Sequence, residues 1–222
     1  MLRRERKFQV TIVVVSPHFD DAVLSCWTVI DGSESVEVVT VFTAGPAPGI
    51  VTGWDRDTGV DSATRMIQRE VENRAALALA GRSATNLGFL ETQYGAGGLD
   101  GSALADHLRD ADVVYAPAGI ATRASQVNGE HGVVRDACLS VRPDVVLYAD
   151  QPYCHYRADT ELPAGMSIGL TRKVVVLSAE QRDRKAEAIR CYTGELTKLV
   201  NIFGLALTDP DQLQHEIFWT PA

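Results

Sequence analysis

The stretch Thr11-Ile12-Val13-Val14-Val15-Ser16-Pro17-His18-Phe19-Asp20-Asp21 joins a run of mostly β-branched residues to a short polar turn. The run Thr11–Val15 is apolar without alternation, which is typical of a parallel strand buried on both faces. Ser16 and Pro17 end the run, and the two aspartates follow where a helix would begin. The stretch therefore predicts a buried first strand that leads through a tight turn into a helix, as in an α/β sheet.

Outward from this stretch, the chain continues to alternate between strand and helix patterns. Further β-branched runs predict strands at Val36–Phe42, Asp112–Ala116, Asp144–Ala149 and Lys173–Leu177. This order predicts an α/β fold in one domain spanning residues 1–222, with a doubly wound, mostly parallel, Rossmann-like sheet and helices on both faces.

Three helices are also predicted, two between these strands and one after the last of them. The clearest is Ser62–Gly81, where apolar residues recur every three or four positions, with Ser62 placed to cap the start and Gly81 the end. The others are Gly132–Val141, which Pro143 follows, and Gln181–Tyr192. In such a sheet, ligands bind at the loops that follow the carboxyl ends of the strands.

Composition narrows the class of partner. The chain has 222 residues, a formal net charge of −8 and 45% hydrophobic residues. An acidic chain lacks the basic surplus that displaces counterions, so nucleic acid and anionic membranes are not expected partners. The four cysteines form no CxxC pair, and no segment reaches the roughly 20 apolar residues of a membrane span. We expect a cytoplasmic protein with a small-molecule partner; its oligomeric state stays open.

The common nucleotide-binding motifs are missing. The best dinucleotide candidate is Gly95-Ala96-Gly97-Gly98-Leu99-Asp100, where Asp100 stands in place of the third glycine. It does not follow the first strand, and no GxxxxGK[ST] motif occurs. The turn after the first strand instead holds three side chains that bind metals or carry protons.

That turn suggests a metal site. His18 and Asp21 are three residues apart at a strand end, and a catalytic zinc usually needs a third protein ligand. His131 opens a predicted helix after another strand and supplies the third, giving N and O ligands that suit zinc or a similar divalent ion. In the alternative interpretation, the aspartates only favour the positive end of the helix dipole, and His131 is structural.

The run Val13-Val14-Val15-Ser16-Pro17-His18-Phe19-Asp20-Asp21-Ala22 resembles the opening motif of the PIG-L/LmbE-like zinc-dependent de-N-acetylases, usually A-H-P-D-D-E. Later segments resemble further family landmarks in the same order: Arg69-Glu70, Leu87-Gly88-Phe89, Glu130-His131 and Asp150-Gln151-Pro152-Tyr153. The resemblance therefore covers most of the chain.

The resemblance implies a role for each matching residue. His18, Asp21 and His131 would bind zinc, and Asp20 would be the general base that takes a proton from water and returns it to the departing amine. Arg69 and Tyr153 would contact the substrate, although a salt-bridged helix arginine is an equal alternative for Arg69. The implied reaction removes an N-acyl group, most simply acetyl, from an amino sugar or related glycoside.

Two positions depart from the family pattern. Ala22 replaces a common glutamate, as in a D-D-A branch of the family. Asn128 stands where many members have the histidine of H-x-D-H, and the loss of one oxyanion donor typically costs about 10²–10³ in rate. We expect His155 to compensate for that loss; its alternative is an exposed loop histidine.

Two other functions stay open. One is a catalytically silent small-molecule binder that keeps the fold and the metal. The other is a phosphate-ester hydrolase, for which the sequence shows neither a second metal site nor the added cationic residues.

Overall fold

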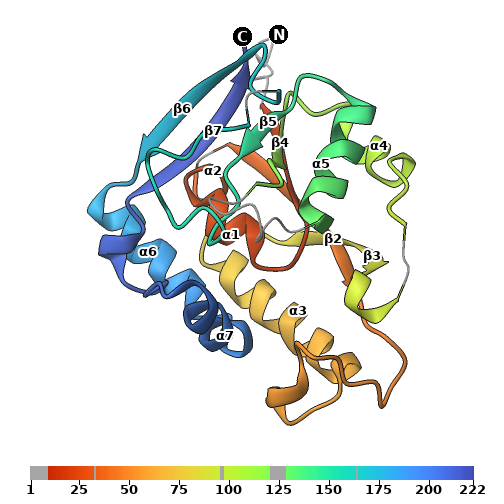
Figure 1. Ribbon diagram of the computed structural model, residues 1–222. Coiled ribbons are helices and arrows are strands. Elements are labelled where there is room, and N and C mark those ends of the chain that lie inside the picture. The colour runs from red at the N-terminus through yellow and green to blue at the C-terminus, as the bar shows by residue number, and fades with distance from the viewer. Residues whose placement is uncertain (1–9, 33, 96–97, 121–128, 164) are drawn as a thin grey trace, which may run out of the picture.

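A computed structural model describes residues 10–32, 34–95, 98–120, 129–163 and 165–222. Its centre is a seven-stranded sheet with the order β3-β2-β1-β4-β5-β7-β6 (Figure 1). The strands are β1 Thr11–Ser16, β2 Ser35–Ala44, β3 Ala84–Leu90, β4 Val113–Pro117, β5 Val146–Tyr148, β6 Leu170–Val176 and β7 His215–Pro221. The five predicted strands are present, with ends displaced by a few residues.

The sheet is parallel from β3 to β5 and antiparallel beyond. β1 pairs in parallel with β2 and β4, so that Val14 lies opposite Val38 on one side and Tyr115 on the other. β7 pairs antiparallel with both β5 and β6. The α/β class and the mostly parallel sheet are confirmed, and the strand predicted at Lys173–Leu177 is an antiparallel edge strand with alternating burial.

Helices cover both faces of this sheet (Figure 1). They are α1 Asp21–Ser25, α2 Trp27–Ile30, α3 Ser62–Ala78, α4 Ser102–Leu108, α5 Gly129–Val141, α6 Ala179–Ile189 and α7 Thr193–Phe203, with 3₁₀ turns η1 Arg56–Thr58, η2 Thr92–Tyr94 and η4 Pro210–Gln212. No described helix has the length and hydropathy needed to cross a bilayer.

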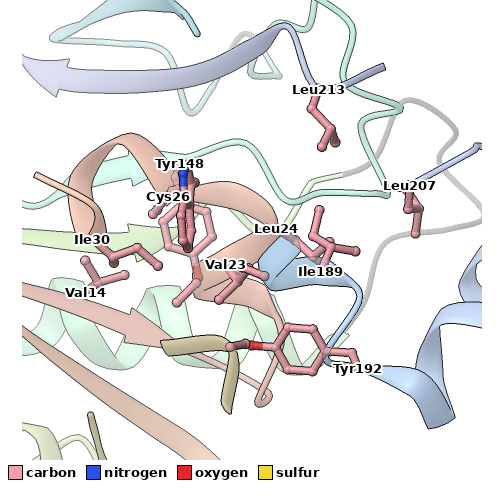
Figure 2. Close-up of a cluster of buried hydrophobic side chains, with 14 of the residues drawn as sticks. Val14, Val23, Leu24, Cys26, Ile30, Tyr148, Ile189, Tyr192, Leu207 and Leu213 are labelled. Carbon is pink, nitrogen blue, oxygen red and sulfur yellow. The ribbon is translucent and has the colours of Figure 1, made fainter. Parts of the chain in front are cut away.

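The first strand explains why two cores form. Successive strand residues point to opposite faces, so Val14 packs into one apolar cluster and Val13 and Val15 into another. The Val14 cluster includes residues of α1, α2, α6 and α7, and Figure 2 shows Val23, Leu24 and Ile189 gathered within it. The other cluster includes residues of α4 and α5. An unbroken apolar strand is thus buried from both sides.

The N-terminus of α3 corrects one prediction. Asp61, and not Ser62, is the capping residue: its backbone is extended, and its Oδ1 accepts a hydrogen bond of 2.8 Å from Thr64 N. Ser62 is already helical, and its Oγ accepts from Thr52 N instead. At the other end, Gly81 has a φ of +67°, a left-handed conformation that glycine adopts without strain.

A fully buried ion pair joins α6 to β7. Lys185 of α6 and Glu216 of β7 are 2.7 Å apart, and both side chains are inaccessible to solvent. Glu216 also accepts hydrogen bonds from Trp27 N, Thr28 N and Thr28 Oγ1 at 2.5–3.0 Å. This carboxylate therefore fastens the start of α2 to the antiparallel end of the sheet.

Candidate active site

The turn after β1 is shaped by its own hydrogen bonds. Ser16 Oγ donates to His18 O at 2.6 Å and accepts from Ala22 N at 3.0 Å, which closes the turn and starts α1. Asp21 Oδ2 accepts from His18 N at 2.8 Å and lies 3.2 Å from His18 Nδ1. The His-x-x-Asp spacing thus places an imidazole nitrogen and a carboxylate oxygen side by side.

His131 reaches the same place from the first turn of α5. The side chain is buried, and its Nδ1 lies 2.6 Å from Asp150 Oδ1, just beyond β5. Its Nε2 lies 3.4 Å from Asp21 Oδ2 and has no hydrogen-bond partner among the described residues. A buried polar nitrogen without a hydrogen-bond partner lowers the stability of the fold by roughly 1–3 kcal/mol. This arrangement therefore favours the binding of a ligand at His131 Nε2.

Ligand atoms of His18, Asp21 and His131 all lie within 4.8 Å of one another. The other ring nitrogen of each histidine contacts a carboxylate. His18 Nε2 lies 2.9 Å from Glu130 Oε2, and His131 Nδ1 lies 2.6 Å from Asp150 Oδ1. Outer carboxylates of this kind orient metal-binding histidines in proteins. The three residues predicted as ligands therefore come together in a geometry that fits a divalent metal.

The electrostatics of the cluster favour a cation. Burial acts to lower the pKa of His131, but the carboxylates of Asp21 and Asp150 outweigh it and raise that pKa. Burial likewise opposes the charged form of His18, while Asp21 and Glu130 raise the pKa of His18 above its usual range. A divalent ion would supply the positive charge that these carboxylates attract.

Asp20 lies beside the cluster, at the N-cap of α1. Burial, and then the charges of Asp21 and Glu195, raise the pKa of Asp20 above its usual range. It lines a cavity of about 460 Å³ into which His18 and Asp21 also open. The structure thus separates the paired aspartates, with Asp21 in the ligand cluster and Asp20 facing the cavity.

The cavity walls come from several loops and from residues of α1, α3, α5 and α7. They include polar side chains (Thr52, Gln93, Glu91, Glu130, Glu195 and Arg69) and apolar ones (Phe19, Leu24, Trp54, Pro152, Tyr153, Tyr192 and Leu199). Tyr153 lies with its ring edge-on to His131, 5.2 Å between centroids. The predicted substrate contact Tyr153 is therefore a wall of the cavity next to a candidate ligand.

Arg69 is both a lining residue and a salt-bridged one. Its side chain projects from α3, and its Nε donates to Glu195 Oε1 at 2.6 Å. Its Nη2 donates to Asp55 Oδ1 at 2.8 Å, and its Nη1 donates to Tyr94 Oη at 2.9 Å. The salt-bridged alternative is therefore observed, and the substrate contact of Arg69 stays a prediction for a residue that lines the cavity.

The structure describes one of the two residues proposed for the oxyanion. Asn128 is outside the described residues. His155 adopts a φ of +53° and packs edge-on against Phe203, with 5.8 Å between ring centroids. His155 is not among the residues that line the cavity, so its compensating role stays a prediction that the geometry does not support.

Glu195 is a residue that the sequence did not point to. It accepts from Trp54 Nε1 at 2.7 Å and from Arg65 Nη2 at 3.1 Å, in addition to Arg69. Arg65 packs against Gly194, where any Cβ would overlap the guanidinium. No local pattern in the sequence singles out Glu195, because its partners on α3 are revealed only by the packing of α7 on that helix.

Solved structures with this fold are known, although no protein-family model and no curated protein sequence matches the chain. The A40926 pseudoaglycone deacetylase Dbv21 is 23% identical, with a TM-score of 0.70 over 96% of this chain and 97% of that one. The zinc-inhibited form of teicoplanin deacetylase Orf2 is 20% identical, with a TM-score of 0.72 over 95% and 97%.

Two more distant structures mark the breadth of the fold. The N,N'-diacetylchitobiose deacetylase from Pyrococcus horikoshii is 16% identical, with a TM-score of 0.65 over 100% of this chain and 87% of that one. GalB, a 4-carboxy-2-hydroxymuconate hydratase from a Pseudomonas, is 18% identical, with a TM-score of 0.56 over 95% of both chains. Likeness at these identities establishes fold, and chemistry has to be argued from the site. The chain therefore has the fold shared by these glycoside deacetylases.

Proposed function

We propose that this protein is a zinc-dependent N-deacetylase that acts on an amino sugar or a related glycoside. The observation that carries the proposal is the buried Nε2 of His131, which has no hydrogen-bond partner among the described residues and faces Asp21 beside the cavity. The resemblance of the opening motif and the fold of the deacetylases support the same function.

His18, Asp21 and His131 would hold the metal. Their two imidazoles and one carboxylate are a ligand set that zinc accepts in catalytic sites. When bound, the ion would supply Lewis-acid polarisation of the amide carbonyl and would acidify the attacking water. The outer carboxylates of Asp150 and Glu130 fix which ring nitrogen of each histidine faces the ligand cluster.

Asp20 would move the proton. It lines the cavity beside the ligands, so its carboxylate can take a proton from the attacking water and deliver it to the amide nitrogen as the C–N bond breaks. Water thereby adds OH to the acyl carbon and H to nitrogen, which gives a carboxylic acid and an amine. The raised pKa of Asp20 suits a group that both accepts and returns a proton near neutral pH.

The rest of the cavity would hold the sugar. Trp54 and Tyr153 offer aromatic faces, and Thr52 and Gln93 offer hydroxyl and amide groups. Aromatic walls with a few polar groups are typical of sites for small neutral ligands. We propose an acetyl group as the acyl substituent and a cytoplasmic location.

The test is amine release from a panel of N-acetyl amino sugars and glycosides by the zinc-loaded protein. Asp20→Asn is the matched control, because it keeps the shape of the side chain but cannot accept the proton. Release by the wild type and its loss in Asp20→Asn is the expected result. If the zinc-loaded wild type binds sugars without releasing amine, the protein is the catalytically silent binder of the same fold.

A further inference from the structure

The turn between β1 and α1 is held by two separate sets of contacts. Ser16 Oγ holds one part, because it donates to His18 O and accepts from Ala22 N. These two bonds fix the peptide units next to the candidate metal ligands. The carbonyl of Phe19 belongs to the other part, since its peptide unit leads directly into Asp20.

Tyr192 contacts this second part of the turn. Its Oη lies 3.2 Å from Phe19 O and 2.9 Å from Asn73 Oδ1, on α3. The side chains of Tyr192 and Asn73 are both buried. A hydroxyl has one proton, which two nearby acceptor oxygens can share. The Tyr192 hydroxyl therefore links the peptide that precedes Asp20 to the middle of α3.

Tyr192 is itself firmly placed, at the junction of α6 and α7. Its backbone N donates to Ile189 O at 3.1 Å, and its backbone O accepts from Glu195 N and Leu196 N at 3.1 and 2.9 Å. Its ring packs into the apolar cluster that contains Val14 (Figure 2). Side chains locked by packing and hydrogen bonds are those that can hold a reacting group in a fixed position.

Asp20 depends on outside support because α1 is short. The helix spans only Asp21–Ser25, and helices of fewer than about 12 residues are not stable by themselves. Among the described residues, the Asp20 side chain accepts no capping hydrogen bond from this helix. Its direction therefore depends on the backbone on either side, where Leu24 N donates to Asp20 O and Tyr192 contacts Phe19 O.

From these contacts we propose that Tyr192 is a positioning residue, whose hydroxyl holds the Phe19–Asp20 peptide so that the Asp20 carboxylate faces the cavity beside the ligand cluster. The inference rests on the proposed function and adds a residue to its machinery. A displacement of about 1 Å at a reacting group can cost about 10²-fold in rate. Because Ser16 supports the ligand part of the turn independently, loss of the hydroxyl impairs proton transfer and spares the metal.

The test is Tyr192→Phe, which removes one oxygen and keeps the ring, with Tyr156→Phe as the matched control. Tyr156 is also buried, and its Oη donates to Leu24 O at 3.2 Å, but Tyr156 is not among the residues that line the cavity. Each change removes one hydroxyl contact to a backbone carbonyl of the same segment. Both variants should therefore show a similar fall in thermal unfolding temperature.

The kinetic results should differ between the two variants. In Tyr192→Phe we expect kcat to fall by about 10- to 100-fold, while KM and zinc content stay within about twofold of the wild type. In Tyr156→Phe we expect kcat to stay within about twofold of the wild type. A residue that only stabilised the fold would not separate kcat from the unfolding temperature in this way.

Crystal structures of the two zinc-loaded variants give a readout that needs no activity. In Tyr192→Phe the Asp20 carboxylate should be displaced by about 0.5–1 Å or occupy two positions, with the ligand atoms of His18, Asp21 and His131 unmoved. In Tyr156→Phe the Asp20 carboxylate should stay in place.

The outcomes separate this inference from the proposed function. If the wild type releases no amine, the deacetylase is refuted, and the position of Asp20 in the two variant structures decides the role of Tyr192. If the wild type is active and both variants lose kcat equally, the deacetylase stands and the positioning role is overturned. An unmoved Asp20 in Tyr192→Phe, or loss of zinc from that variant, also overturns it.

Discussion

Two groups of buried charges lie near the two ends of α1, and they differ in how fully their polar atoms are paired. Around Glu216, every carboxylate contact is filled: Lys185 and the groups of Trp27 and Thr28 donate to it, and nothing in the pair reaches solvent. Around His131, a buried ring nitrogen has no hydrogen-bond partner among the described residues, and like charges meet at Asp20 and Asp21. The complete network stabilises the fold, and the incomplete one is built to receive a ligand.

The largest expected effect is on metal content. His131→Ala removes one of three ligands, and we expect the purified protein to fall from about one bound divalent ion to almost none while remaining folded. His107→Ala is the matched control, because the His107 ring pairs with Glu37, belongs neither to the ligand cluster nor to the cavity lining, and should leave the metal in place. Metal content is read by elemental analysis, and unchanged content in His131→Ala would overturn the ligand assignment.

The next effect separates chemistry from binding. Asp20→Asn should keep the metal and lose about 10²–10⁴ in kcat, because an amide cannot take the proton from water. Steady-state kinetics measures the loss in kcat, and elemental analysis of the same preparation measures whether the metal is retained. If metal is lost together with activity, Asp20 is itself a ligand, and the two aspartates do not have different roles.

The complete network predicts an effect on stability alone. Lys185→Met leaves the Glu216 charge buried without its partner, so the free energy of unfolding should fall by about 3–5 kcal/mol. Denaturant titration measures this loss. In the folded fraction, zinc affinity should match that of the wild type, and a weakened metal site would mean that the two networks are coupled.

A smaller effect is expected from the outer carboxylate of the incomplete network. Asp150→Asn keeps a hydrogen-bond acceptor for His131 Nδ1 but removes the charge, and outer-carboxylate changes typically cost about 10- to 100-fold in metal affinity. Competition with a chelator measures this change. A fall in thermal stability with unchanged zinc affinity would make Asp150 a purely structural partner, like Glu216.

The strands and the ligand set could be predicted because their signals are local. An unbroken apolar run such as Thr11–Val15 reports burial on both faces, and His18 and Asp21 are adjacent in the turn that follows it. The sequence did not predict β3, because Ala84–Leu90 lies at the edge of the sheet and carries polar residues. It did not predict β7, because His215–Pro221 contains Glu216, whose partner Lys185 is distant in sequence.

Glu195 shows the limit of local patterns most clearly. A glutamate in the first turn of a helix looks like a favourable dipole contact. Its actual partners, Arg69 and Trp54, lie well over a hundred residues earlier in the chain. Only the folded chain brings them together, so these contacts could not be predicted from spacing.

We propose that a divalent ion completes the network around His131. Crystals grown with zinc and measured at the zinc absorption edge test it most directly. We expect an anomalous peak about 2.0–2.2 Å from His131 Nε2, a ring nitrogen of His18 and a carboxylate oxygen of Asp21. The proposal is contradicted if no peak lies there and His131 Nε2 is instead hydrogen-bonded to a water or a side chain of the protein.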